Sequence, residues 1–154
     1  MSFQNYPTAN LSRRLAALFY DSFVLFSLYI LGGFILVAII KAVNQGEFPG
    51  ALPMSVNLSL FFCITFMYYT HSWLKGGQTI GMKAWRICLI NARQQHGKTL
   101  PLQLSQCMLR CGCGFFSTVL GLLGFVWMLF DKQQRTWHDM ASLTRVVHMP
   151  AGMK

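Results

Sequence analysis

Acidic residues are scarce in this chain of 154 residues: there are four, against 13 Lys and Arg, and charged residues make up only 11% of the sequence. A typical globular protein has about 25% charged residues. The shortage excludes an ordinary soluble domain, which needs charges to cover its surface. Because 54% of the residues are apolar, we expect a single domain that lies largely in lipid, where apolar side chains need no burial inside the protein.

The sequence also lacks a disulfide framework, a metal motif and a catalytic set. Its five cysteines are an odd number and lie in or beside apolar stretches, so we interpret them as reduced, buried thiols. The spacing Cys107-x-x-x-Cys111-x-Cys113 is not that of a zinc or iron–sulfur site. Residues 76–83 lack the Gly-Lys-Ser/Thr ending of a phosphate loop and are interpreted as a flexible exit from the preceding helix. We expect no enzyme, cofactor or metal.

Two long apolar runs are the strongest positive signal. Residues 15–40 contain one charge, Asp21, and residues 54–74 contain none. About 20 apolar residues suffice to cross a bilayer, so the runs predict a hairpin of transmembrane helices joined by the Gly- and Pro-containing linker 42–53. The first run is too long for the apolar region of a signal peptide, and we expect it to be retained. The aromatic residues Tyr68, Tyr69 and Trp73 are typical of a lipid–water interface.

The basic residues are distributed unevenly around these runs. Residues 75–110 carry six Lys or Arg and no acid, whereas the linker 42–53 contains only Glu47. By the positive-inside rule, we expect the amino terminus and residues 75–110 in the cytoplasm and the linker outside. The net charge of +9 therefore indicates orientation, with anionic lipid head groups as a secondary partner, rather than nucleic-acid binding.

The last third of the chain leaves two topologies open. Residues 85–90 are strand-like and the polar stretch 91–98 resembles a turn, which predicts a small cytoplasmic β-hairpin. The apolar residues 111–130, interrupted by glycines, can form one crossing helix. Alternatively, residues 102–130 form two shorter helices that return the chain to the cytoplasm. We favour the return, because residues 143–148 are strand-like and can pair with residues 86–90.

Asp21 is the most informative single residue. A charged side chain at the centre of a membrane helix costs about 2.5–3.5 kcal/mol on insertion scales, and less near the end of the helix. A direct ion pair requires Arg14, two helical turns earlier on the same face, to reach inward, or a basic residue such as Arg110 to approach from a neighbouring helix. Hydrogen bonds are the alternative way to stabilise the carboxylate. Two interpretations stand: Asp21 fixes helix packing, or it binds a proton or cation. Near the end of the chain, His138 is interpreted as solvated, beside Trp137 as an interface anchor.

Three segments together resemble the RDD family of bacterial membrane proteins. They are Arg-Leu-Ala-Ala-Leu-Phe-Tyr-Asp at 14–21, Gly-Gln-Thr-Ile-Gly-Met-Lys at 77–83 and Trp-His-Asp-Met-Ala-Ser-Leu-Thr at 137–144. The resemblance implies that Arg14 is the arginine and Asp21 and Asp139 are the aspartates that name the family, with Asp131 as the runner-up for the second. Arg145 departs from the apolar residues that relatives tend to have there.

We therefore predict an all-α membrane protein: a transmembrane helical hairpin, a third hydrophobic helical region and a small cytoplasmic β-hairpin. The expected division is a cytoplasmic tail (1–12), an RDD-like transmembrane domain (13–148, with helices at about 15–40, 54–74 and 102–130) and a carboxyl-terminal tail (149–154). The resemblance implies the bacterial plasma membrane.

Two functions remain open. The resemblance favours a transporter of protons or small cations, with Asp21 as the titratable site and Arg14 and Asp139 at its cytoplasmic mouth. Two or three helices can hardly enclose a transport pathway alone, so transport requires a second copy of the chain or a membrane partner. The alternative is a non-transporting accessory or scaffolding protein, whose basic segment binds a partner or anionic lipid.

Overall fold

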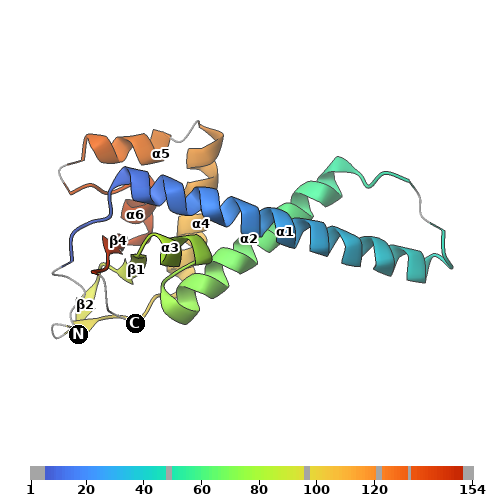
Figure 1. The fold of residues 1–154 in the computed structure, drawn as a ribbon, viewed down its shortest axis with the longest axis horizontal. Coiled ribbons are helices and arrows are strands. Elements are labelled where there is room, and N and C mark those ends of the chain that lie inside the picture. Colours follow the sequence, from blue (N-terminus) through green and yellow to red (C-terminus); the bar gives the residue numbers. More distant parts are fainter. Residues whose placement is uncertain (1–5, 48–49, 96–97, 121–122, 132, 151–154) are drawn as a thin grey trace.

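The computed structural model describes residues 6–47, 50–95, 98–120, 123–131 and 133–150. It is mostly helical and has two parts (Figure 1). Helices α1 (Leu11–Val43) and α2 (Met54–Gly76) extend together as a long hairpin. The remaining elements gather around the start of α1 and the end of α2, and we call this unit the head (residues 6–21, 72–95, 98–120, 123–131 and 133–150).

The hairpin helices are nearly continuous apolar runs, as the sequence predicts. Among the described helices, α1 is the one long and apolar enough, by length and composition, to cross a membrane, and only 6% of its most apolar stretch is buried. The two helices approach closely at Gly32, where an added Cβ would lie 2.8 Å from Ile64 Cδ1. A larger residue at this crossing would require the Ile64 side chain to shift. Many large apolar side chains of both helices are exposed.

The first elements of the head are α3 (Ile80–Ala84) and strand β1 (Ile87–Asn91). Strand β1 pairs with β4 (Thr144–His148) in an antiparallel ladder in which Leu89 faces Val146. The predicted pairing of these two distant segments is therefore confirmed. Strands β2 (Gln94–Gln95) and β3 (Lys98–Thr99) form a separate two-residue ladder. The expected hairpin, with residues 85–90 as a strand and 91–98 as its turn, is therefore wrong: β1 pairs with β4, and β2 lies within the expected turn.

Both ends of the described chain meet at β4. Ala9 N donates to Val146 O at 3.0 Å, and His148 N donates to Pro7 O at 2.9 Å. The Arg145 guanidinium donates to Thr8 Oγ1 at 2.7 Å. Arg145 thus has a defined place beside the amino-terminal segment. The outer parts of the expected tails, residues 1–5 and 151–154, lie outside the described residues.

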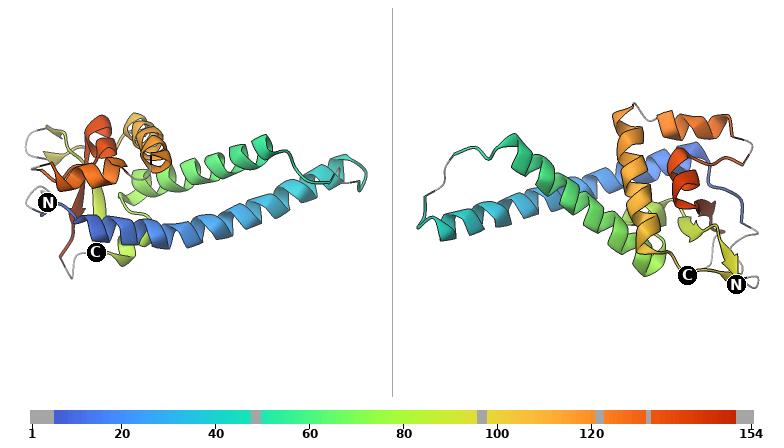
Figure 2. Two further views of the ribbon diagram at one scale, coloured as in Figure 1. Left: turned by 90° about the horizontal axis from the view of Figure 1, so that it is seen from above. Right: turned by 180° about the vertical axis from the view of Figure 1, so that it is seen from behind.

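The third apolar region is broken rather than a single crossing helix. It contains α4 (Leu104–Val119), α5 (Leu123–Val126) and the short 3₁₀ helix η2 (Trp127–Leu129). Helix α6 (Trp137–Ser142) follows. Of the two predicted topologies, the structure has the one with shorter helices, and it leads the chain back to β4. Figure 2 shows α4 crossing the head at a steep angle to α1.

Two expectations about the end of α2 are wrong. Trp73 is buried in the core of the head with Ala17, Met82 and Leu89, so it is not an interfacial anchor. Residues 76–83 are not a flexible exit: Gly77 ends α2 in the left-handed conformation, and the following residues pack against α1. Both differences have one cause: other elements of the head cover the end of α2 and pack against its apolar side chains.

The cysteine prediction holds only in part. All five thiols are free, but only Cys88 and Cys107 are buried, whereas Cys63 is exposed on α2. Among the described residues no group of His, Cys, Asp or Glu could hold a metal ion.

Candidate functional site

Asp139 lies at the centre of a buried ion cluster, with an arginine on each of its carboxylate oxygens. Arg14 Nη1 donates to Oδ2 and Arg110 Nη1 donates to Oδ1, each at 2.5 Å. Asp139 is 1% exposed, and both arginines are buried. The three residues belong to α1, α4 and α6, so the Arg14–Asp139–Arg110 cluster joins three helices that are distant in sequence.

The start of α6 holds Asp139 in place. Thr136 is the N-cap residue: its side chain accepts from Asp139 N at 3.3 Å, and its own N–H donates to Asp139 Oδ2 at 3.3 Å. This reciprocal capping box satisfies two backbone donors that the helix cannot satisfy itself. One carboxylate oxygen is therefore fixed by local structure as well as by Arg14.

The cluster has more positive than negative charge, and neutral groups satisfy the surplus donors. Arg14 Nε donates to Ala9 O at 3.0 Å. Arg110 Nη1 donates to Thr144 Oγ1 at 2.8 Å, and its Cζ lies 5.4 Å from the centroid of the Trp73 ring. A guanidinium group over an indole ring is stabilised by the ring quadrupole. The second cation is thereby accommodated without a second carboxylate.

The charges around Asp139 determine its protonation. Burial by itself would raise its pKa, but the guanidinium groups of Arg110 and Arg14 outweigh that effect and hold the pKa of Asp139 well below its usual range. The neighbouring His138 is buried against the Phe125 ring, with the ring centroids 4.6 Å apart. Burial, with a contribution from Arg110, lowers the pKa of His138 to about 3. The expectation of a solvated His138 is therefore wrong.

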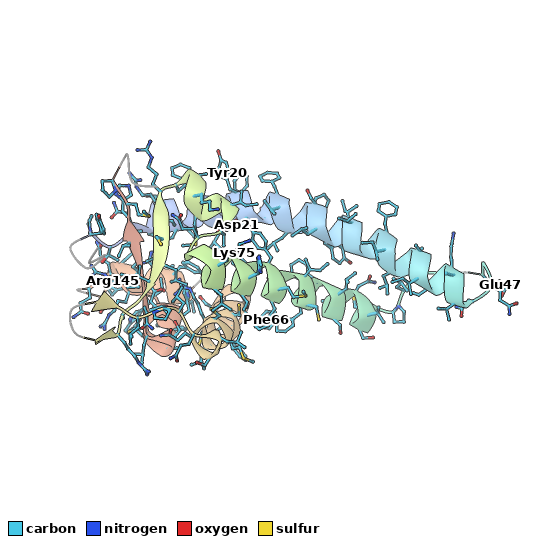
Figure 3. The ribbon with its side chains drawn as sticks, turned by 90° about the horizontal axis from the view of Figure 1, so that it is seen from below. Tyr20, Asp21, Glu47, Phe66, Lys75 and Arg145 are labelled. Carbon is cyan, nitrogen blue, oxygen red and sulfur yellow. The ribbon has the colours of Figure 1, made fainter. Side chains whose placement is uncertain are left out.

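Asp21 belongs to a second, separate site between α1, α2 and α3 (Figure 3). Its Oδ1 accepts from Tyr68 Oη at 2.7 Å and from Gly81 N at 2.8 Å, and its Oδ2 accepts from Thr79 Oγ1 at 2.6 Å. The carboxylate is 1% exposed. Thr79 also caps α3 by accepting from Met82 N. Asp21 thus attaches α3 and the end of α2 to α1.

Of the two kinds of partner that the sequence leaves open for Asp21, an ion pair and hydrogen bonds, the structure has hydrogen bonds. Within the part of the chain that the structure describes, Asp21 has no cation within ion-pair distance, because Arg14 and Arg110 both bind Asp139. Hydroxyl and amide donors take the place of a cation. The two family aspartates therefore have different partners: neutral donors for Asp21 and arginines for Asp139.

Asp131 lies apart from both sites. It forms a local ion pair with Arg135, whose Nε donates to Asp131 Oδ2 at 3.1 Å. The hydrogen bond from Arg135 lowers the pKa of Asp131. The geometry thus joins Asp139, and not Asp131, to the buried arginines.

Several contributing residues were not identified from the sequence. Thr136 has a signal that could have found it, since Thr-x-x-Asp is the spacing of a capping box. Thr79 and Gly81 lie in the RDD-like segment 77–83, but no local spacing links them to Asp21, because their role depends on how α3 docks onto α1. The aromatic character of Tyr68 predicts a place at the interface, whereas its hydroxyl donates to Asp21.

Both oxygens of each carboxylate accept hydrogen bonds from donors fixed by the fold. This arrangement is suited to holding helices together, and it places both carboxylates, each 1% exposed, out of reach of a ligand at the surface. The Asp21 site differs from the Asp139 cluster because all its donors are neutral: two hydroxyl groups and one backbone amide. A carboxylate among hydroxyl groups can also exchange a proton.

A comparison with known families matches the RDD family model over residues 8–142. No curated protein and no solved structure matches the chain. The matched region contains both sites, including Arg14, Asp21, Arg110 and Asp139. With its apolar α1 exposed and its three expected family residues in two buried polar sites, the chain is a membrane protein that belongs to the RDD family.

Proposed function

We propose that this protein is a multi-pass protein of the plasma membrane, in which α1 and α2 cross the bilayer and the head lies on the cytoplasmic side. Helix α1 has 33 residues and is about 50 Å long at about 1.5 Å per residue, more than the roughly 30 Å of hydrocarbon. Its first turns therefore extend into the head-group region. The excess of basic residues in the head supports this orientation by the positive-inside rule.

We further propose that the protein is a non-transporting accessory or scaffolding protein whose basic face binds anionic lipid head groups. The observation that carries this proposal is a group of cations without acids. Lys83 and Arg86 are exposed on and after α3. Arg13 lies beside them, since its Nη1 donates to Trp85 O at 3.4 Å.

No acid neutralises this basic face (Arg13, Lys83 and Arg86). The sequence has only four acids, all of them among the described residues. Asp21 and Asp139 are buried with their own partners, and Asp131 pairs with Arg135. Glu47 lies at the opposite tip of the hairpin (Figure 3). The positive potential also reaches His148, whose pKa is lowered by burial and by Arg13 and Arg86.

Aromatic side chains accompany the cations. The rings of Tyr20 and Trp85 meet edge to face with centroids 6.2 Å apart, and both side chains are exposed. Ile80 is exposed on the same side of α3 as Lys83, three residues away. Aromatic rings beside Lys and Arg are typical of the membrane interface, where the rings lie at head-group level and the cations contact phosphates.

Native mass spectrometry of the purified protein with phosphatidylglycerol tests this proposal. Each cation near an anionic surface contributes about 1 kcal/mol to binding. We therefore expect Lys83→Gln to release bound phosphatidylglycerol at a lower collision energy than the wild type. Lys41→Gln is the matched control, because it removes the same charge at the other end of α1. Equal lipid retention by the two variants would contradict the proposal, and binding of a protein partner without lipid dependence would favour a docking role instead.

Proton or cation transport is a second candidate function, and the Asp21 site is the observation that favours it. A buried carboxylate with two hydroxyl neighbours, Tyr68 and Thr79, lies on the helix that is proposed to cross the membrane. Transport requires this carboxylate to exchange its donors for a proton or cation. It also requires self-association, since a hairpin of two helices encloses no pathway.

Flux measurements in proteoliposomes separate the two functions. Transport predicts that Asp21→Asn abolishes pH-dependent flux of protons, sodium or potassium while the protein still folds and accumulates. The accessory function predicts no flux by the wild type and either no effect or loss of the protein in the variant. Asp131→Asn, the same chemical change at an ion pair outside the buried sites, is the control.

A further inference from the structure

Helix α4 has its polarity reversed relative to a helix of a soluble protein. Its polar residues Gln106, Arg110 and Ser117 are buried in the head, whereas Ser105, in the first turn, is exposed. Its large apolar residues are exposed, and Phe116 is 67% exposed. These exposed residues recur at the spacing of one helix face, which we call the outer face of α4: Leu104, Met108, Leu109, Phe115 and Phe116.

Polar contacts fix which side of α4 faces the head. Gln106 Nε2 donates to Ser142 O at 3.1 Å and to Leu143 O at 3.3 Å. One turn later, Arg110 donates to Asp139. These bonds hold the polar side of α4 against α6 and the start of β4. The outer face consequently points away from the head.

The outer face points to the side on which the hairpin extends. In Figures 1 and 2, α6 and β4 lie on one side of α4, and the long part of α1 and α2 extends on the other. The Phe115 ring meets Phe62 of α2 edge to face, with centroids 6.3 Å apart. The outer face of α4 is therefore continuous with the apolar surface of α2.

The length of α4 is too small for a crossing helix. Its 16 residues give about 24 Å, which is less than the roughly 30 Å of hydrocarbon. Because its axis runs crosswise to α1, a bilayer crossed by α1 would meet α4 along its side rather than at its end.

We infer that α4 lies in the plane of the membrane, with its outer face among the acyl chains of the cytoplasmic leaflet and its polar face on the head. This inference rests on the proposed crossing by α1 and α2. In-plane amphipathic helices bury their apolar face about 5–10 Å into the boundary between head groups and acyl chains. The occupant is lipid rather than a second copy of the chain, because the face adjoins the lipid-facing surface of α2. Helix α4 then sets the depth at which the head rests on the bilayer.

Nitroxide labels on single cysteines measure this arrangement in nanodiscs of phosphatidylethanolamine and phosphatidylglycerol. The five native cysteines are replaced, and labels are placed at Leu104, Met108 and Phe116, with Phe26 and Ile39 on α1 as references. We expect all three α4 labels to collide with oxygen but not with a water-soluble nickel complex. Because α4 lies in the plane, Leu104 and Phe116 should have the same depth.

Three results overturn the inference. A depth difference of about 18 Å between Leu104 and Phe116, the rise of twelve helical residues, means that α4 crosses the membrane. Access of the nickel complex to the α4 labels means that the face lies in water. If neither oxygen nor the nickel complex reaches the α4 labels, a second copy of the chain covers the outer face. If the Phe26 and Ile39 labels are themselves in water, the proposed membrane crossing fails, which is a different outcome.

A nitrile label keeps the inference testable if the cysteine-free protein does not fold. Substituting p-cyano-phenylalanine for Phe116 leaves all native cysteines in place and changes one exposed ring. We expect its infrared stretch to match that of the same label at Phe34 of α1. A stretch matching the free amino acid in buffer contradicts the inference.

Discussion

Asp139 accepts a hydrogen bond of 2.5 Å from Arg110, and Arg14 lies at the same distance from its other oxygen. The two contacts are not equivalent in their consequences. Removing Arg110 leaves a one-to-one pair between Arg14 and Asp139. Removing the charge of Asp139 leaves two buried guanidinium groups without a carboxylate, and breaking a buried pair in this way costs about 3–5 kcal/mol.

We therefore expect Asp139→Asn to destabilise the protein more than Arg110→Met. Asparagine keeps the size of the side chain and removes only the charge, and methionine keeps most of the apolar stem of Arg110. Thermal unfolding in detergent, followed by intrinsic fluorescence, gives the ranking. Greater stability of Asp139→Asn than of Arg110→Met would mean that the excess charge is not balanced as the geometry indicates.

His138 makes stability depend on pH. Its pKa is about 3 in the folded protein against an ordinary 6.5, so the folded state keeps it neutral while the unfolded state binds a proton. Stability is therefore complete above pH 6.5 and falls as the pH drops towards 3, by about 1.4 kcal/mol per pH unit at most. The pKa of Asp139 is also lowered, but its contribution is lost only below its ordinary pKa of 3.8.

The two residues thus act in different pH ranges. Unfolding temperatures measured between pH 4 and pH 7 should fall steeply for the wild type and much less for His138→Gln. The control is His71→Gln, which changes an exposed histidine of α2 and should retain the wild-type slope. An unchanged slope in His138→Gln would falsify the assignment.

Gly81 is required where α3 meets α1. An added Cβ would overlap Ala17 O and lie 3.0 Å from Asp21 Cγ. Because backbone atoms cannot give way easily, we expect Gly81→Ala to destabilise the head by about 1–3 kcal/mol. Gly33→Ala is the matched control: no atom lies within 4 Å of its added Cβ, and alanine favours a helix by up to about 1 kcal/mol. We therefore expect Gly81→Ala to lower the unfolding temperature and Gly33→Ala to raise it.

The Tyr68 hydroxyl contributes two hydrogen bonds to the Asp21 site: it donates to Asp21 Oδ1 and accepts from Ile80 N at 3.2 Å. Tyr68→Phe leaves both groups short of a partner, and we expect a loss of about 1–3 kcal/mol. Tyr29→Phe removes a hydroxyl whose bond to Asn57 is longer, at 3.4 Å, and should have a smaller effect. Hydrogen exchange at α3 locates the change, since Tyr68→Phe should loosen α3 specifically.

The apolar pattern predicted the hairpin well. The expected helices 15–40 and 54–74 correspond to α1 (Leu11–Val43) and α2 (Met54–Gly76). Long runs are reliable because each residue adds to the same signal. The ladder between β1 and β4 was also predicted, since both segments are short and strand-like. The family residues were found by resemblance, and the structure joins Arg14 to Asp139.

The partners of Asp21 and the form of the third apolar region could not be predicted in the same way. Partner choice depends on tertiary docking: nothing local in the sequence brings Thr79 and Gly81 to Asp21. For residues 102–130, total hydrophobicity concealed the periodicity. The spacing of Leu104, Met108 and Phe115 around Gln106 and Arg110 indicates an amphipathic helix, which a simple count of apolar residues does not distinguish from a crossing one.

The distance of 125 residues between Arg14 and Asp139 has a consequence for biosynthesis. A ribosome completes α1 and α2 long before the chain reaches Asp139 or β4. Until then Arg14 has no carboxylate to bind, and the segment around Thr8 has no strand to join. The hairpin is therefore synthesised before the head can close, and a chain interrupted before residue 139 retains Arg14 without its carboxylate partner.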